Sequence, residues 1–292
     1  MIISDGQWAE TRDALRRAGD RFADLLPAVP DPAARATRSW SVEQTAAHMV
    51  SLAWACETIV EPGSDSGRDA RLDTQLRKTQ VDTVRDLNDL LLRQYIVERG
   101  LVPLQDRLRE HVRSILRATD GRDPTEAVDW LGGSRLPLGG LLAHLTNELL
   151  IHGWDIARAG SLRWEIPARD AGLFIELFLV GVTSYGYGAL LDSTAPPPRR
   201  RIAVQFRSRH TRPLTIVLDG TGRYDGNRGR VTVAEPERGD DVRLWFDPPT
   251  LNLVLFGRMS RLRGALTGRL VVRGRRPWLL PVFLRTVHMP DN

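Results

Sequence analysis

The sequence predicts an α+β protein of two domains, a helical bundle over residues 1–162 and an α+β domain over residues 163–292. Three observations support this fold class. The chain of 292 residues is longer than one typical domain. Apolar residues in the first half recur with the 3.6-residue period of amphipathic helices, whereas β-branched and aromatic residues in the second half alternate over short runs. Strands that are followed by helices indicate an antiparallel sheet with helices on one face.

The first domain is expected to contain four main helical segments. They cover residues 6–26, 42–60, 79–118 and 141–159. Ser41 is expected to cap the second segment, because a hydroxyl at this position can accept a hydrogen bond from the first helical turn. Pro103 is expected to break the third segment in two. Helices joined in this way form a bundle, and bundles often hold metal sites between facing helices.

The second domain is expected to begin with one more helix, over residues 168–191. Strands are predicted at 201–206, 214–218, 230–233, 241–246 and 269–273, with helices at 249–256, 259–266 and 278–287. Turn-forming residues such as Asp225-Gly226-Asn227 separate the alternating runs.

The charge of the chain is positive and comes almost entirely from arginine. The formal net charge is +5, the isoelectric point is about 10.0, and Lys78 is the only lysine. The arginines could bind anionic substrates through paired hydrogen bonds, or the excess could reflect genomic base composition. Aromatic residues are not interleaved with the basic ones, so no nucleic-acid partner is expected.

Cysteine content and hydropathy indicate a cytoplasmic protein. Cys56 is the single cysteine, which excludes an internal disulfide framework and suits a reducing compartment. It lies two helical turns beyond His48, ~12 Å away, and is interpreted as a buried structural thiol. No secretory signal is recognised and no apolar stretch is long enough to cross a bilayer, so no membrane partner is expected.

A carboxylate and an imidazole lie four residues apart in an apolar helix, at Glu148 and His152. Residues at this spacing share one helix face and can hold one ion. His48 on the second helix would complete a three-ligand site with an open position, which is typical of catalytic zinc. The alternatives are a hydrogen-bonded core histidine at position 48 and an arginine partner, such as Arg158, for the buried carboxylate.

Two further side chains lie on the same helix face. His144 could be a ligand, a group that contacts a ligand, or a filler, and contact with a ligand is favoured because a fourth ligand would overfill the site. Asp155 could accept the free N–H of the His152 ring, as partners of metal-bound imidazoles usually do. It could instead form a surface ion pair with Arg158.

The residues that carry these motifs resemble a known family. The stretch from Trp40 to Val50 and the run Glu-Leu-Leu-Ile-His-Gly-Trp-Asp at 148–155 are similar to the DinB-type metal-binding four-helix bundle of mycothiol-dependent maleylpyruvate isomerases. The second half resembles a sterol-carrier-protein-like domain, through Phe246-Asp247-Pro248, Leu255-Phe256-Gly257-Arg258 and the run at 268–274. The resemblance covers most of the chain, in the domain order of the family.

The resemblance implies site residues and cofactors. A divalent ion, usually zinc, would be held by His48, Glu148 and His152. Arg258 matches a functional arginine of the isomerases, so a catalytic and cofactor-binding role is expected for it. The thiol cosubstrate implied by the family is mycothiol.

The predicted function is therefore that of a metal-dependent enzyme that activates a low-molecular-weight thiol. The metal would lower the pKa of the thiol, and the thiolate would attack a small electrophile. Rotation of the adduct and expulsion of the thiol would give cis–trans isomerisation, whereas release of the adduct would give S-transfer. Two other classes stay open: a lipid or small-ligand carrier with a metal-stabilised bundle, and a partner-binding protein whose metal site has decayed.

Overall fold

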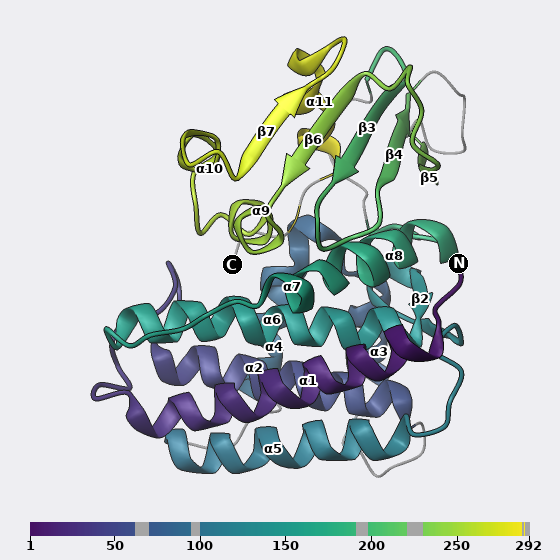
Figure 1. The fold of residues 1–292 in the computed structure, drawn as a ribbon. Helices are drawn as coiled ribbons and strands as arrows, with labels where there is room; N and C mark the ends of the chain where they lie inside the picture. Colours follow the sequence, from purple (N-terminus) through teal and green to yellow (C-terminus); the bar gives the residue numbers. More distant parts are fainter. Residues whose placement is uncertain (62–69, 95–99, 191–197, 221–229, 288, 290–292) are drawn as a thin grey trace.

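The computed structural model describes residues 1–61, 70–94, 100–190, 198–220, 230–287 and 289. Its described part consists of a helical region, followed in the chain by a region that contains a β-sheet (Figure 1). This arrangement confirms the predicted fold class. The likeness of the second region to sterol-carrier proteins and the domain division at residues 162/163 stay predictions.

Four long helices form the predicted bundle. They are α1 (Asp5–Leu25), α2 (Val42–Val60), α5 (Leu101–Ala118) and α6 (Leu138–Ala159). Helices α1 and α2 each pack against both α5 and α6, so the four surround a common core. Large apolar side chains fill that core: Leu15, Phe22, Met49, Leu104 and Leu108. Burial of each such side chain stabilises the fold by about 1.5–3 kcal/mol.

The ends of the helices test two predictions, the cap at Ser41 and the break at Pro103. Ser41 caps α2 as predicted: its Oγ accepts the Gln44 N–H at 3.2 Å, and the Gln44 side chain accepts the Ser41 N–H at 2.9 Å. The prediction that Pro103 breaks the third segment is wrong: α4 covers Val84–Gln94, and α5 begins at Leu101, directly after Gly100. Pro103 belongs to the first turn of α5, where a proline removes no intrahelical hydrogen bond.

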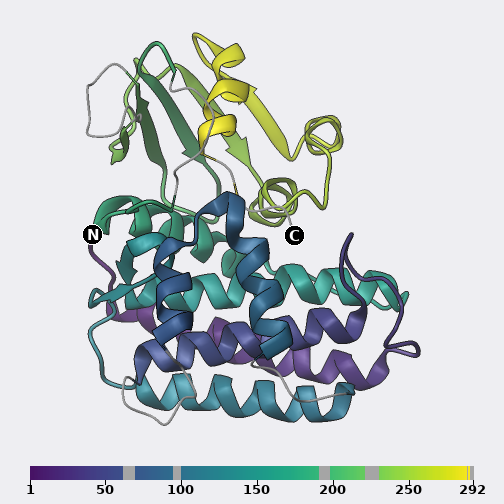
Figure 2. The same cartoon turned by 180° about the vertical axis from the view of Figure 1, so that it is seen from behind.

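Short elements cover one face of the bundle. The sequence did not predict α3 (Ala70–Lys78) or the hairpin of β1 (Ala127–Asp129) and β2 (Arg135–Pro137), whereas a 3₁₀ turn at Val81–Thr83 lies within the predicted helical segment 79–118. The pair α3 and α4 stands across α2 in Figure 2. Hairpin strands of three residues each are too short to show a periodicity.

A segmented helix lies between the bundle and the sheet (Figure 1). It comprises α7 (Ala168–Leu173), a π-helical turn η4 (Phe174–Leu179) and α8 (Val180–Tyr185). It packs along α6, and it ends before residue 191 because Gly186 has a φ of +119°, which other residues rarely adopt. The last residue of the predicted helix, 191, lies outside the described part.

The second region contains a five-stranded sheet in the order β5-β4-β3-β6-β7. Its strands are β3 (Ile202–Arg207), β4 (Leu214–Asp219), β5 (Arg230–Ala234), β6 (Val242–Phe246) and β7 (Leu270–Arg273). Three neighbouring pairs are antiparallel as predicted, but β3 and β6 are parallel. The alternation of residues within a strand predicts which face is buried and carries no information on strand direction. The predicted turn Asp225-Gly226-Asn227 lies outside the described residues.

Three helices accompany the sheet, and α9 connects it to the bundle. They are α9 (Pro248–Leu255), α10 (Arg261–Leu266) and α11 (Leu280–Thr286), the last preceded by a 3₁₀ turn η5 (Pro277–Leu279). Helix α11 lies against the sheet, as Figure 2 shows, and α9 packs on α7. The buried Asn252 side chain donates to Asn147 Oδ1 at 2.7 Å and to the Ala171 carbonyl at 3.0 Å. These contacts hold the second region against α6.

Candidate metal centre and cavity

Helix α6 carries a buried row of ionisable side chains. Glu148, His152 and Asp155 are 5%, 1% and 2% exposed. Spacings of four and three residues place them on one side of the helix. Their neighbours on α6 are mostly apolar, and the helix is enclosed by the bundle and by the segment of α7 and η4. Charges in such a place need partners inside the protein.

Helix α2 brings the third predicted ligand to this row. His48 is buried, and its ring centroid lies 5.1 Å from that of His152. One ligand atom from each of His48, Glu148 and His152 lies within 4.8 Å of the other two. Tetrahedral zinc bonds of about 2 Å place ligand atoms about 3.3–3.6 Å apart, so shifts of each atom below about 1 Å close this group on one ion. The structure thus brings together the three residues singled out in the sequence.

The imidazole of His48 has two unpaired nitrogens. Both are buried, and neither has a hydrogen-bond partner among the described residues. Such atoms are nearly always paired in folded proteins, so this exception needs an explanation. Burial is the main cause that lowers the pKa of His48, to about 3, and His152 lowers it further. The ring is therefore neutral, which is the form that binds metals. The donor set fits a divalent cation.

Carboxylates lie on both sides of His152. Its Nε2 lies 3.5 Å from Glu148 Oε2, and its Nδ1 lies 3.1 Å from Asp155 Oδ2. Burial lowers the pKa of His152, but the hydrogen bonds to Asp155 and Glu148 outweigh burial and raise it. Burial also raises the pKa of Glu148, yet the hydrogen bond from His152 and the nearby imidazoles lower it to about 2. Glu148 is therefore a charged carboxylate.

Asp155 connects this group to the second region. Arg258 Nη2 lies 2.8 Å from Asp155 Oδ2, and Arg258 Nε lies 3.2 Å from both carboxylate oxygens. Of the two roles expected for Asp155, the contact with His152 is confirmed. The surface pair with Arg158 is wrong, because Arg158 donates to the Ala36 carbonyl instead. A carboxylate on the second nitrogen of a ligating imidazole fixes the orientation of the ring.

Arg258 donates its hydrogen bonds to acceptors within the protein. Its side chain is 7% exposed, and it donates to the Phe256 carbonyl at 2.7 Å in addition to Asp155. Burial raises the pKa of Asp155, but His152 and Arg258 together lower it, which keeps the carboxylate charged. The geometry makes Arg258 a residue that positions Asp155. The predicted contact of Arg258 with substrate or cofactor stays a prediction.

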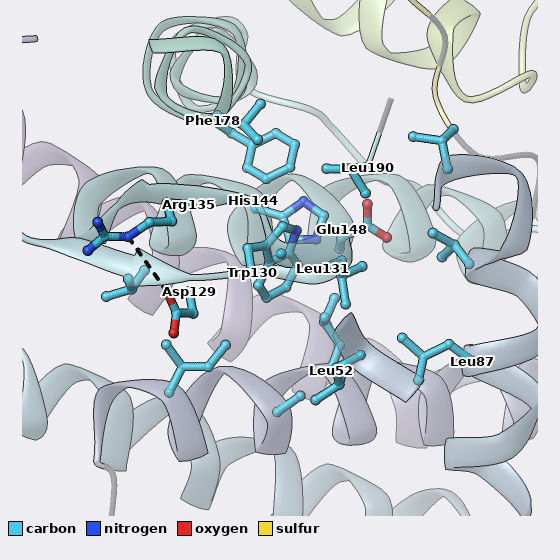
Figure 3. Close-up of a pocket in the computed structure, with 18 of the residues that line it drawn as sticks. Leu52, Leu87, Asp129, Trp130, Leu131, Arg135, His144, Glu148, Phe178 and Leu190 are labelled. Atoms are coloured by element: carbon cyan, nitrogen blue, oxygen red, sulfur yellow. Dashed lines mark ion pairs between the residues drawn. The ribbon is translucent and has the colours of Figure 1, made fainter. Parts of the chain in front are cut away.

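A cavity of about 630 Å³ lies beside the three predicted ligands, and His48 and Glu148 form part of its lining. Much of the remaining wall is aliphatic, with contributions from α2, α4 and the β1–β2 hairpin, as Figure 3 shows. The labelled apolar side chains include Leu52, Leu87 and Leu131. An ion pair of Asp129 and Arg135 at 3.6 Å lies at the hairpin. A ligand in this cavity would therefore contact apolar groups close to His48 and Glu148.

His144 also lines the cavity, but it lies outside the group of three. Its ring stacks on Phe178 with centroids 4.5 Å apart and meets the edge of Trp130 at 5.1 Å (Figure 3). Its Nδ1 is buried without a hydrogen-bond partner among the described residues. Sequence reasoning missed Trp130 and Phe178, because single aromatic residues at distant positions carry no signal of mutual contact.

Cys56 lies in α2 with a buried side chain that is 1% exposed. Burial, and to a lesser extent the charge of Glu148, raises the pKa of its thiol. A thiol that stays protonated is a poor nucleophile and a poor metal ligand. The prediction that the Cys56 thiol is buried is confirmed.

Comparisons with known proteins were made for the whole chain. The sequence model of the mycothiol maleylpyruvate isomerase N-terminal domain matches residues 11–157. The chain is similar to the crystal structure of the mycothiol-dependent maleylpyruvate isomerase, with a TM-score of 0.48 and 12% identity over 87% of this chain and 90% of the other. A mutant of that isomerase gives the same TM-score with 13% identity over 91% and 92%. No curated protein matches the chain.

Proposed function

The chain belongs to the family of proteins with the mycothiol maleylpyruvate isomerase N-terminal domain, and on this premise we propose that it is an enzyme that activates mycothiol at a divalent metal ion. The observation that carries the proposal is the buried imidazole of His48, which has no hydrogen-bond partner among the described residues and lies beside Glu148 and His152. Zinc is the expected ion, because two imidazoles and one carboxylate form a donor set of catalytic zinc sites.

The residues around this site have distinct roles in the proposed reaction. A divalent ion held by His48, Glu148 and His152 would supply positive charge beside the thiol sulfur and so lower the pKa of the thiol. Asp155, which is held by Arg258, keeps the His152 ring turned with Nε2 toward Glu148. The apolar cavity wall limits the access of water, and a thiolate with fewer water neighbours is a more effective nucleophile.

The substrate is a small electrophile that enters the cavity. Addition of the thiolate to an activated carbon–carbon double bond forms a carbon–sulfur bond and breaks the π bond, whose electron pair moves to the conjugated carbonyl oxygen. If the adduct rotates about the resulting single bond and the carbon–sulfur bond breaks again, the double bond re-forms as the trans isomer and the thiolate is regenerated, as in a maleylpyruvate isomerase. If the adduct instead takes up a proton from water and leaves intact, the enzyme is a mycothiol S-transferase. The isomerase outcome follows from the family name, and both outcomes use the same residues. A cytoplasmic location stays a prediction.

Metal analysis combined with a thiol assay tests the proposal. Protein purified without a metal-binding tag should contain close to one divalent ion per chain and should consume mycothiol or isomerise maleylpyruvate. His152→Ala should abolish both metal content and turnover. His111→Ala is a matched control, because His111 is a buried histidine outside the group of three and lies 2.5 Å from a glutamate, Glu57. Turnover in metal-free His152→Ala would refute the mechanism.

A carrier for lipids or small apolar ligands is the second candidate, and the largely apolar wall of the cavity favours it. In this case the metal would stabilise the bundle without taking part in catalysis. Extraction of the purified protein with organic solvent, followed by mass spectrometry, distinguishes the two functions. A retained lipid together with no thiol-dependent turnover would favour the carrier.

A further inference from the structure

The positive charge of the chain is concentrated in one C-terminal segment. Residues 248–289 contain eight arginines and no aspartate or glutamate. The whole chain has 41 basic and 36 acidic residues, so without these eight arginines 33 basic residues stand against 36 acidic ones. A general arginine bias would not remove acidic residues from one segment. The segment is therefore strongly basic, whereas the rest of the chain is slightly acidic.

Most of these arginines are free to meet a partner. Arg258 and Arg276 form ion pairs with Asp155 and Asp241. The other six have exposed side chains and no carboxylate partner within the described part of the chain: Arg261, Arg263, Arg269, Arg273, Arg275 and Arg285. Surface arginines are usually interspersed with acidic residues, so a group without any is a site of positive potential.

Exposed apolar side chains lie among these arginines. Leu262 and Leu266 of α10 are 69% and 78% exposed, Val272 of β7 is 39% exposed, and Trp278 of η5 is 66% exposed. Leu262 and Leu266 share one helix face, since they are four residues apart. Groups of large apolar side chains with such high exposed fractions are uncommon on the surface of a soluble protein.

The elements that carry both sets are adjacent. Helix α10 packs on β7 and leads into it, and η5 is the next element after β7, with three residues between them. Strand β7 is one of the two edge strands of the described sheet, and Figure 1 shows it with α10 on the outer flank of the second region. We call the exposed residues of 261–278 the α10–β7 surface. It combines basic and apolar side chains on one edge of the molecule.

We propose that the α10–β7 surface binds the anionic phospholipid surface of a membrane. Exposed leucine and tryptophan enter the boundary between headgroups and acyl chains, while arginines beside them pair with lipid phosphates. No described helix is long and apolar enough to cross a bilayer, and surface binding of this kind requires none. The proposal revises the expectation, made from the sequence, that the protein has no membrane partner.

Other occupants fit this surface less well. A second copy of the chain placed symmetrically on it would bring two sets of unpaired arginines together, which costs free energy. Single-stranded nucleic acid is usually bound through several aromatic platforms, whereas three of the four exposed apolar residues here are aliphatic. Aliphatic side chains beside arginines match the chemistry of a lipid surface.

Sedimentation with vesicles tests the proposal on the full-length protein. Vesicles of phosphatidylcholine with phosphatidylglycerol should bind the protein, and vesicles of phosphatidylcholine alone should bind it at least tenfold more weakly. Binding should weaken as the salt concentration rises, because salt screens the phosphates. Arg261→Gln with Arg263→Gln should weaken binding roughly tenfold or more. Leu262→Ser with Leu266→Ser should do the same with intact arginines.

Matched variants on α5 provide the controls, because α5 lies on the far side of the bundle from α10 (Figure 1). Arg113 and Arg117 are exposed there, and Val102 is 57% exposed. Arg113→Gln with Arg117→Gln, and Val102→Ser, should leave vesicle binding unchanged. Circular dichroism verifies that every variant is folded.

Several results would overturn the proposal. One is the absence of binding to anionic vesicles, and another is an equal loss of binding in the α5 controls. Tighter binding to DNA than to vesicles at equal phosphate concentration would assign the surface to nucleic acid. A dimer that dissociates in the variant with serine at 262 and 266, without any vesicle binding, would assign it to a second copy of the chain.

Discussion

Two buried glutamates, Glu148 in α6 and Glu176 in η4, have opposite surroundings. Glu176 is 8% exposed and accepts hydrogen bonds from Arg169 Nη1 at 2.7 Å and from the Arg212 N–H at 2.6 Å. Arg169 also pairs with Glu10 at 2.8 Å. Glu148 is 5% exposed, and within the described part of the chain it has no arginine partner. Its neighbours are His152 at 3.5 Å, the ring of His48, which has no hydrogen-bond partner among those residues, and His144.

The difference separates a structural carboxylate from one that can bind a ligand. Burial is similar for the two residues, so burial alone does not identify a site. The hydrogen bonds that Glu176 accepts from Arg169 and from the Arg212 N–H compensate for the water that its carboxylate loses on burial. Glu148 lies beside His48, whose ring nitrogens have no partner among the described residues, and a cation held with His152 would satisfy both the carboxylate and the His48 ring. Four substitutions can test this comparison.

Glu148→Gln should produce the largest effect. The substitution keeps the shape of the side chain but removes the charge, so metal content should fall below a tenth of that of the wild type. Thiol-dependent kcat/KM should fall by more than the roughly 10- to 100-fold typical of residues that only orient a ligand. Elemental analysis and the thiol assay on one preparation measure both quantities. Full metal content in this variant would contradict the comparison.

Arg258→Gln should produce the next largest effect, through Asp155. Loss of the ion pair leaves Asp155 free to move, so the His152 ring is held less well. Metal affinity should fall about 10- to 100-fold in a chelator competition. Arg276→Gln is the control, because Arg276 forms a similar pair with Asp241 at 2.8 Å, within the second region. Equal losses in both variants would indicate a general effect of destabilisation.

Glu176→Gln should have the opposite effect to Glu148→Gln: it should lower the stability of the protein and leave the metal content unchanged. It removes a charged acceptor from Arg169 and from the Arg212 N–H, so urea denaturation should show a loss of about 2 kcal/mol in the free energy of unfolding. Metal content should stay at the wild-type level. Glu110→Gln, at an exposed ion pair with Arg107, should change stability by less than about 0.5 kcal/mol.

His144→Phe should produce the smallest effect. A phenyl ring keeps the stack on Phe178 but removes the unpaired Nδ1 from the cavity wall. Metal content should not change, because His144 lies outside the group of three. The KM for the electrophile should change by less than about tenfold, with kcat nearly constant. A loss of metal in this variant would make His144 a fourth ligand.

Local patterns made a large part of this protein predictable. The 3.6-residue period located the four bundle helices, and the hydroxyl of Ser41 marked the start of α2, because both depend on neighbours within a few residues. The spacing of Glu148 and His152 placed both side chains on one helix face for the same reason. The short β1–β2 hairpin and the end of α8 at Gly186 were missed, because they depend on single turns.

The sequence by itself determined which chemistry was available: a carboxylate and an imidazole one turn apart in an apolar helix, and a second histidine on another helix. Only the tertiary structure decided which residues meet. Arg258 reaches Asp155 across 103 residues of chain, Trp130 and Phe178 enclose His144, and β6 lies parallel to β3. These contacts depend on how whole elements pack, and the period of residues within one element carries no record of its neighbours in space.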